Sequence, residues 1–110
     1  MRRGEVRWYT FEAPNKRRPV VVLTRTPSIG YLYDVTVAQI TSTIRNVPAE
    51  VVLDEEDGMK QACAVNLFQI TTVPKTKIGP LITVLSPEKM REIAEAIRYA
   101  LDLGLLASLS

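Results

Sequence analysis

The sequence has no histidine and only one cysteine among its 110 residues. Histidine is the side chain whose ordinary pKa suits proton transfer near neutral pH, so any catalysis by this chain must use other groups. Cys63 stands between Ala62 and Ala64 in an apolar stretch. It has no second cysteine for a disulfide and no cysteine spacing for a metal site. We therefore expect a buried structural thiol.

Long hydrophobic runs are also absent. No apolar stretch approaches the roughly 20 residues that a membrane-spanning helix needs. The first residues, Met1-Arg2-Arg3-Gly4, lead into charged strand sequence rather than into the apolar segment of a signal peptide. We expect a cytoplasmic protein without a membrane segment. Its length suits a single domain over residues 1–110, since domains commonly have about 100 to 200 residues.

Charge is present in ordinary amount but is unevenly distributed. The net charge is +2, and residues 1–45 carry eight basic and three acidic side chains, a net of +5, while residues 46–110 carry a net of −3. A basic half is typical of polyanion binders, although charges far apart in sequence need not share a face. An ordinary solvated surface explains the same numbers equally well.

Short segments rich in β-branched and aromatic residues, separated by turn residues, predict about six strands within residues 4–85. The apolar run Val20-Val21-Val22-Leu23 predicts a strand buried on both faces, with Pro19 as its first residue. The acidic run 54–57 predicts an exposed loop, with Gly58 free to take a positive φ. The expected strands are 6–11, 19–23, 33–41, 50–53, 63–73 and 81–85.

Ser86-Pro87-Glu88 predicts the start of a helix at about 87–103, because it combines a hydroxyl N-cap, an N1 proline and an acid near the positive end of the dipole. Gly104 is its expected stop. An apolar stripe at three- and four-residue spacing should face the sheet. The stripe consists of Met90, Ile93, Ala94, Ile97 and Leu101. The sequence thus predicts a mainly β fold with α: a small curled β-barrel with a C-terminal amphipathic helix packed on it.

Two of the expected strands have, at one end, polar side chains that suit a phosphate. Arg17-Arg18 precede the strand that begins at Pro19, and Thr41-Ser42 end another. A guanidinium supplies charge and a planar set of donors, and hydroxyls supply oriented polar groups. This combination suggests chemistry on a phosphodiester.

Several motifs along the whole chain resemble, in order and spacing, those of the MazF/PemK family of toxins. Each motif is weak alone, but their joint order is specific. They are RGEV at 3–6, RPVVVL at 18–23, QITS at 39–42, Gly58 ahead of the long strand, Gln69-Ile70, and ITVLS at 82–86 ahead of the helix.

This resemblance implies an SH3-like barrel that acts as a homodimer and serves as the toxin of a type II toxin-antitoxin system. It implies a sequence-specific endoribonuclease that cuts single-stranded mRNA without a metal or other cofactor. In such enzymes the ribose 2′-hydroxyl attacks the adjacent phosphate and leaves a 2′,3′-cyclic phosphate and a 5′-hydroxyl. The partner would be a MazE-like acidic antitoxin whose disordered tail occupies the RNA groove.

Carried over by motif, Arg18 and Thr41 are the catalytic pair. Arg18 would stabilise the charge that grows on the nonbridging phosphate oxygens. Thr41 would donate its hydroxyl to a phosphate oxygen while its β-branched body stays in the sheet, with Ser42 as a helper. Without the resemblance, the residues favour a solvated arginine before a proline and a strand threonine that makes a local turn bond.

Further RNA contacts require basic groups for the backbone and planar groups for unpaired bases. Lys16, Arg17 and Arg45 are candidates for the backbone, together with Ser42. Gln69 could hydrogen-bond a base edge or satisfy backbone groups.

Tyr31 and Tyr33 are candidates for base stacking, although ordinary packing explains them at least as well. Trp8 lies on an alternating strand, and we assign it to the core.

No residue stands out as the catalytic base. An arginine with an ordinary pKa above about 12 stays protonated near neutral pH. Many members of the family carry a Gly-Ser-Glu-Gln type segment before the Arg-Pro motif, whereas this chain has a short turn, Ala13-Pro14-Asn15-Lys16. Glu12 is the nearest upstream acid, and we assign it no role. Phe68 and Thr71 also depart from the acid and the arginine that often flank Gln-Ile in the family.

Two other functions are compatible with the sequence. One is a binding protein on the same fold, like the CcdB toxins that poison DNA gyrase without cleaving anything. The other is a degenerate member that retains RNA binding alone. A labelled RNA would distinguish them, because only the endoribonuclease would shorten it and leave cyclic phosphate ends.

Overall fold

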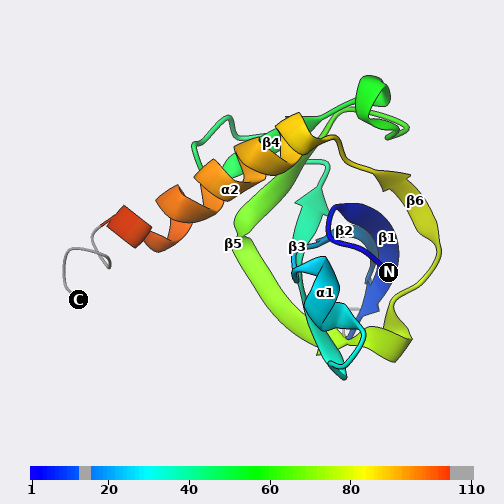
Figure 1. Ribbon diagram of the computed structural model, residues 1–110. Helices are drawn as coiled ribbons and strands as arrows, with labels where there is room; N and C mark the ends of the chain where they lie inside the picture. Colours follow the sequence, from blue (N-terminus) through cyan, green and yellow to red (C-terminus); the bar gives the residue numbers. More distant parts are fainter. Residues whose placement is uncertain (13–15, 105–110) are drawn as a thin grey trace.

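The structure is a computed structural model that describes residues 1–12 and 16–104. Within these residues six strands form one sheet in the order β4-β5-β3-β2-β1-β6, and every neighbouring pair is antiparallel. The sheet curls into an open half-barrel with the C-terminal helix on one side (Figure 1). The elements are β1 (Glu5–Phe11), β2 (Lys16–Val22), α1 (Thr26–Ile29), β3 (Asp34–Thr41), β4 (Glu50–Leu53), η1 (Glu55–Asp57), β5 (Cys63–Pro74), η2 (Lys75–Lys77), β6 (Leu81–Val84) and α2 (Pro87–Leu101).

The predicted mainly β fold is confirmed, but two details of the prediction are wrong. β2 begins at Lys16 rather than at Pro19, and α1 forms one helical turn where the sequence pattern predicted none. Pro19 is tolerated inside β2 because pairing with β3 starts only at Val20. Of the short turn predicted over residues 13–16, residues 13–15 lie outside the described residues.

The core has two parts, one on each face of the sheet. Val20, Val21 and Val22 have no exposed surface, which confirms the prediction that this strand is buried on both faces. Val21 packs in a helix-side cluster that includes residues of α2, whereas Val20 and Val22 pack in an α1-side cluster with Ile29 of α1. Successive side chains of β2 therefore enter different clusters. By the same alternation, Arg17 and Arg18 project from opposite faces of the strand.

The helix α2 begins as predicted, with the Ser86 side chain accepting a hydrogen bond from the backbone nitrogen of Lys89 at 3.1 Å. It packs against β4 and β5. It ends at Leu101, with Asp102 as a left-handed cap at φ 51°, so the predicted stop at Gly104 is wrong. No helix in the part of the chain that the structure describes is long and apolar enough to cross a membrane.

The predicted apolar stripe of α2 is shifted around the helix. Ile93 and Ala96 are buried, whereas Ala94 and Leu101 are exposed. At 3.6 residues per turn, Ala94 and Leu101 lie about 100° and about 80° around the helix from Ile93, at the edge of the buried face. Ala96, which was not in the predicted stripe, lies on the other side of Ile93 and is buried instead.

The long strand β5 contains a bulge that explains its poor alternation. Ala38 of β3 pairs with Ile70, but the next residue, Gln39, pairs with Asn66, so residues 67–69 have no partner on β3. The Asn66 side chain accepts a hydrogen bond from the backbone nitrogen of Phe68 at 3.0 Å and fixes the bulge. The side chain of Phe68 is consequently 63% exposed.

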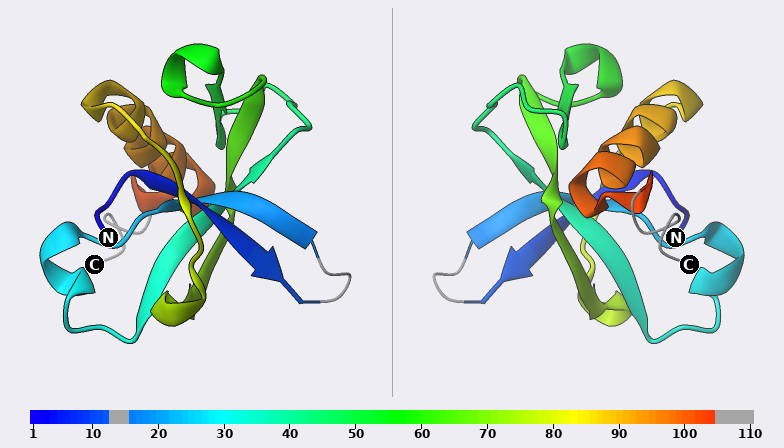
Figure 2. Two further views of the ribbon diagram at one scale, coloured as in Figure 1. Left: turned by 90° about the vertical axis from the view of Figure 1, so that its right-hand side faces the viewer. Right: turned by 90° about the vertical axis from the view of Figure 1, so that its left-hand side faces the viewer.

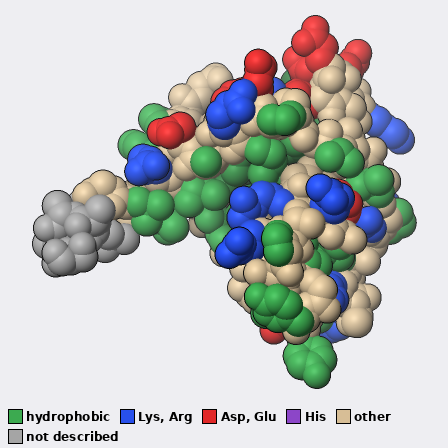
Figure 3. All heavy atoms as spheres, viewed as in Figure 1, with side chains coloured by type: hydrophobic (Ala, Val, Ile, Leu, Met, Phe, Trp, Pro, Cys, Tyr) green, Lys and Arg blue, Asp and Glu red, His purple; other side chains and the backbone are tan. Residues whose placement is uncertain are grey.

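Residues 54–56 of the acidic run are exposed, as predicted, and Asp57 is partly buried; Asp54 caps the 3₁₀ helix η1, which replaces the expected loop. Asp54 accepts a hydrogen bond from the backbone nitrogen of Glu56 at 2.9 Å, and Asp57 accepts one from that of Asp54 at 3.0 Å. Acidic side chains gather at this corner of the molecule (Figure 3). Gly58 follows with a φ of 93°, which confirms the predicted positive φ.

Candidate active site

A groove of about 810 Å³ opens where the β1–β2 hairpin, the end of β3, the segment after Gly58 and strand β6 meet. The β1–β2 hairpin projects beyond the rest of the sheet (Figure 2), and it contributes Trp8, Arg17 and Arg18 to the groove. The lining residues are Trp8, Lys16, Arg17, Arg18, Pro19, Ile40, Thr41, Ser42, Met59, Lys60, Gln61, Cys63, Leu81 and Ile82.

The charge of the groove is of one sign. Among the described residues that line it, four are basic and none is acidic; the basic ones are Lys16, Arg17, Arg18 and Lys60. A concave surface lined by one sign of charge attracts a polyanion and concentrates it. The fold thus gathers Lys16, Arg17, Arg18, Thr41 and Ser42, five of the seven predicted site residues, in one place.

Arg18 and Thr41 occupy matching positions on neighbouring strands. The β2–β3 pairs run from Val22–Val37 to Val20–Gln39, and Arg18 and Thr41 each lie two residues further along their strands, beyond the last pair. Side chains at opposed positions project from the same face of a sheet. β2 and β3 therefore present a guanidinium and a hydroxyl to the same side of the groove.

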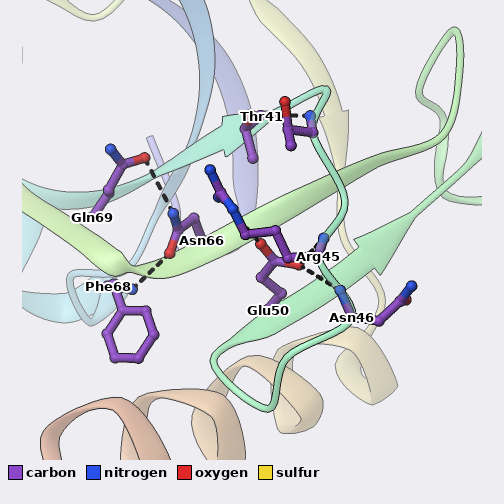
Figure 4. A network of polar contacts seen from close by, with 8 residues as sticks. Thr41, Arg45, Asn46, Glu50, Asn66, Phe68 and Gln69 are labelled. Atoms are coloured by element: carbon purple, nitrogen blue, oxygen red, sulfur yellow. Dashed lines mark hydrogen bonds and ion pairs between the residues drawn. The ribbon is translucent and has the colours of Figure 1, made fainter.

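The Thr41 hydroxyl also makes the local turn bond that the residues alone suggested. Its oxygen accepts a hydrogen bond from the backbone nitrogen of Thr43 at 3.1 Å (Figure 4). A hydroxyl has one proton to give and two lone pairs to accept with. The turn bond uses a lone pair, so the proton of Thr41 can still be donated to a phosphate oxygen.

Trp8 is not a core residue, so its sequence-based assignment is wrong. It is half-buried, lines the groove, and lies beneath Arg17, whose guanidinium carbon is 4.2 Å from the centre of the Trp8 ring. Trp8 pairs with Pro19 in the β1–β2 ladder. The hairpin extends past the core at this point, which is why an inward-pointing indole meets the groove rather than the apolar interior.

Arg45 and Gln69 lie outside the residues that line the groove. Arg45 pairs with Glu50 at 3.9 Å, and the Glu50 side chain, only 2% exposed, also accepts hydrogen bonds from the backbone nitrogens of Arg45 and Asn46. Gln69 sits on the β5 bulge and accepts a hydrogen bond from Asn66 at 3.4 Å. Figure 4 shows both residues in the polar network beyond Thr41.

Tyr31 and Tyr33 are also away from the groove. They are 75% and 92% exposed and lie just before β3, at the end of that strand opposite to Thr41. Neither tyrosine is among the residues that line the groove.

Sequence reasoning missed a second wall made by Lys60, Gln61, Leu81 and Ile82. The only available signal was Gly58, whose positive φ turns the chain toward the groove. Thr83 of β6 donates its hydroxyl to the backbone oxygen of Asp57 at 3.0 Å, and this contact ties η1 to β6. Nothing in the local sequence indicates that β6 lies across the groove from the first residues of β2.

Cys63 is the other ionisable group at the groove. It is 6% exposed, as predicted for a structural thiol. Burial raises its pKa above the ordinary value, and the negative charges of Asp57 and Asp54 raise it further. Among residues 1–12 and 16–104, no three His, Cys, Asp or Glu side chains are grouped so that they could hold a metal ion.

The family model described as "PemK-like, MazF-like toxin of type II toxin-antitoxin system" matches residues 2–101. The endoribonuclease MazF3 of Mycobacterium tuberculosis is 38% identical over 89 residues, which cover 81% of this chain and 86% of that relative. The solved structure of the M. tuberculosis toxin MazF-mt6 is 34% identical, with a TM-score of 0.82, covering 89% of this chain and 96% of that one. A mycobacterial endoribonuclease in complex with its cognate antitoxin shares the fold, with a TM-score of 0.84 at 24% identity, over 94% of this chain and 96% of that one.

Proposed function

This chain belongs to the PemK-like, MazF-like toxins of type II toxin-antitoxin systems, and from that membership we propose that it is an endoribonuclease that cuts single-stranded mRNA at specific sequences. The observation that carries the proposal is that Arg18 and Thr41 line one groove whose charged described residues are all basic. The groove suits an extended polyanion, and the pair suits one phosphate within it.

In the proposed reaction the 2′-hydroxyl oxygen of the ribose forms a bond to the adjacent phosphorus, and the bond from phosphorus to the 5′-oxygen of the next nucleotide breaks. The 2′-hydroxyl loses its proton to solvent, and the leaving 5′-oxygen gains one from solvent. The products are a 2′,3′-cyclic phosphate and a 5′-hydroxyl, and the chemistry requires no metal.

Arg18 and Thr41 act on the charge that accumulates on the nonbridging oxygens. A guanidinium donates from a planar fork, and the Thr41 hydroxyl adds a neutral donor held in place by its bond to Thr43. Donors fixed before the reaction lower the barrier because they need not reorganise. Loss of one such donor typically costs about 2.7 to 4 kcal/mol of barrier.

The proposal is tested by incubating end-labelled single-stranded RNA with the protein in excess EDTA and mapping the cut ends by sequencing. We expect cyclic phosphate ends at a recurring sequence. Arg18→Ala should reduce cleavage about 100- to 1,000-fold with an unchanged circular dichroism spectrum. Arg25→Ala, which removes an exposed arginine that does not line the groove, is the matched control and should cut normally. Full activity of Arg18→Ala would overturn the assignment.

We also propose that the partner is a MazE-like acidic antitoxin whose disordered tail lies in the same groove. Support comes from the basic lining, because an acidic segment would meet Lys16, Arg17 and Lys60 as RNA does. The antitoxin should compete with labelled RNA, and Lys16→Glu with Lys60→Glu should weaken both ligands together. Antitoxin binding that is unchanged by the double variant would place the tail elsewhere.

A homodimer is proposed from the apolar side chains that remain exposed around α2 and the β5 bulge (Figure 3). Phe68, Tyr99 and Leu101 are 63%, 55% and 51% exposed. A two-fold pairing would bury such a surface against its own copy. Light scattering should give twice the chain mass, and Phe68→Glu should shift the protein toward monomer; a monomeric wild type at micromolar concentration would refute the pairing.

A further inference from the structure

Arg17 and Arg18 are adjacent in sequence but occupy different faces of β2. Arg17 pairs with Thr10 and Arg18 pairs with Tyr9 in the β1–β2 ladder. Trp8 is two residues from Thr10 and so shares its face, where Arg17 covers the indole ring. Arg18 shares the other face with Tyr9, which packs against the α1-side cluster. The side chains of the two arginines therefore leave β2 on opposite faces, although both residues line the groove.

The backbone of Trp8 is held by hydrogen bonds on both sides of the residue. The backbone nitrogen of Trp8 donates to the oxygen of Pro80 at 3.1 Å, and the nitrogen of Gly79 donates to the oxygen of Trp8 at 2.8 Å. Arg7 also donates to the Gly79 oxygen at 3.1 Å and pairs with Glu5 at 2.7 Å. An indole fixed in this way can order the guanidinium stacked on it.

The stack presents a flat, cationic surface to the groove. Trp8 is half-buried beneath, and Arg17 is exposed above it. Proteins that read single-stranded RNA bind splayed bases by stacking them on aromatic rings or on guanidinium planes. A phosphate, by contrast, is bound in the plane of the guanidinium, at the edge that carries its N–H donors.

We propose that Trp8 and Arg17 form a nucleobase subsite, in which an unpaired base of the RNA stacks on the outer plane of the Arg17 guanidinium with the Trp8 ring beneath. This rests on the proposed function, since the base belongs to a nucleotide next to the phosphate at Arg18 and Thr41. Arg17 is then a specificity-determining residue that binds a base, rather than a ligand of the RNA backbone.

The substitution Arg17→Lys separates these two roles. Lysine keeps the positive charge for a phosphate but has no plane to stack on. If Arg17 binds a base, Arg17→Lys should raise KM about 5- to 150-fold, the range expected for loss of one base stack. The dependence of binding on salt should stay unchanged, because the number of neutralised phosphates is the same. Arg25→Lys, which makes the same exchange at an exposed arginine that does not line the groove, is the matched control and should leave KM unchanged.

The base itself is located with a series of RNA substrates, each with one abasic nucleotide near the mapped cut. Wild type should lose affinity at one abasic position, and Arg17→Lys should no longer distinguish that RNA from the intact one. If Arg17→Lys binds and discriminates like wild type, Arg17 contacts only phosphate and the proposal is wrong.

Binding can be followed separately from cleavage because Trp8 is the only tryptophan in the chain. Intact RNA added to the Arg18→Ala variant should change the fluorescence of Trp8, and RNA abasic at the stacked position should change it much less. Trp8→Phe keeps a ring beneath Arg17 and should retain part of the abasic discrimination. Fluorescence that responds equally to both RNAs would overturn the subsite even if the protein cuts RNA. A wild type that binds RNA with this signature but never cuts it would refute only the proposed catalysis.

Discussion

The side-chain oxygen of Thr41 lies 3.1 Å from the backbone nitrogen of Thr43 and accepts its hydrogen bond. This contact lets one hydroxyl close the turn after β3 and still offer its proton to a ligand. The structural and catalytic interpretations of this threonine, which compete when only the sequence is considered, are therefore compatible in the same geometry.

Thr41→Ser and Thr41→Val should consequently behave differently. Serine keeps the hydroxyl and should retain most of the cleavage activity, whereas valine keeps the β-branched shape and should reduce kcat about 100-fold or more. Both rates are measured on the same end-labelled RNA. Thr72→Val, which removes a hydroxyl from an exposed position on β5, should cut at the wild-type rate. A fully active Thr41→Val would remove Thr41 from the proposed mechanism.

Gly58→Ala should destabilise the protein and disturb one wall of the groove. Gly58 has a φ of 93°, and a Cβ placed there would collide with the side chain of Thr83. A non-glycine residue in the left-handed region costs about 1 to 2 kcal/mol before any collision is counted, so thermal unfolding should show a lower Tm. Cleavage should fall as well, because Met59, Lys60 and Gln61 follow this turn directly.

Gly30→Ala provides the comparison. Gly30 has a φ of −62°, and nothing lies within 4 Å of a Cβ built there. Alanine can adopt that conformation without strain and should leave Tm unchanged or raise it slightly. Equal effects of the two substitutions would show that the geometry at Gly58 is not what makes it necessary.

Glu50→Gln should loosen the segment between β3 and β4. The Glu50 carboxylate accepts from the backbone nitrogens of Arg45 and Asn46 at 2.9 and 3.2 Å, and a neutral amide accepts these bonds more weakly. We expect a loss of about 1 kcal/mol in unfolding free energy and faster hydrogen exchange at those two amides. Glu92→Gln alters a solvent-exposed helix pair with Lys89 and should change stability by less than about 0.5 kcal/mol.

The sequence predicted the elements of this fold well because their signals are local. The short strands separated by turn residues, the helix start at Ser86-Pro87 and the positive φ of Gly58 each depend on a few neighbouring residues. Arg18 and Thr41 were predicted because motifs that resemble those of a known family carried them, and both residues line the groove.

The features that the sequence did not predict depend on residues distant in the chain. Trp8 lines the groove together with Leu81 and Ile82 of β6, and its backbone is bonded to Gly79 and Pro80, all of which come from the other end of the sequence. Arg45 and Gln69 are held in a separate network by Glu50 and Asn66, and the β5 bulge that displaces Gln69 is visible only in its pairing with β3. Strand periodicity cannot report such contacts.

Cys63 should make the protein less stable as the pH rises into the alkaline range. Its pKa is raised chiefly by burial and also by Asp57 and Asp54, so the thiolate forms more readily in the unfolded chain than in the folded one. The contribution of the protonated thiol to the unfolding free energy is fully present below the ordinary thiol pKa, and it is lost as the pH rises through the raised pKa. Chemical unfolding at a series of pH values should show this decline in wild type and a smaller one in Cys63→Ala. Alkylation by iodoacetamide should likewise be slow in the folded protein and fast in denaturant, and rapid alkylation of the native thiol would contradict its burial.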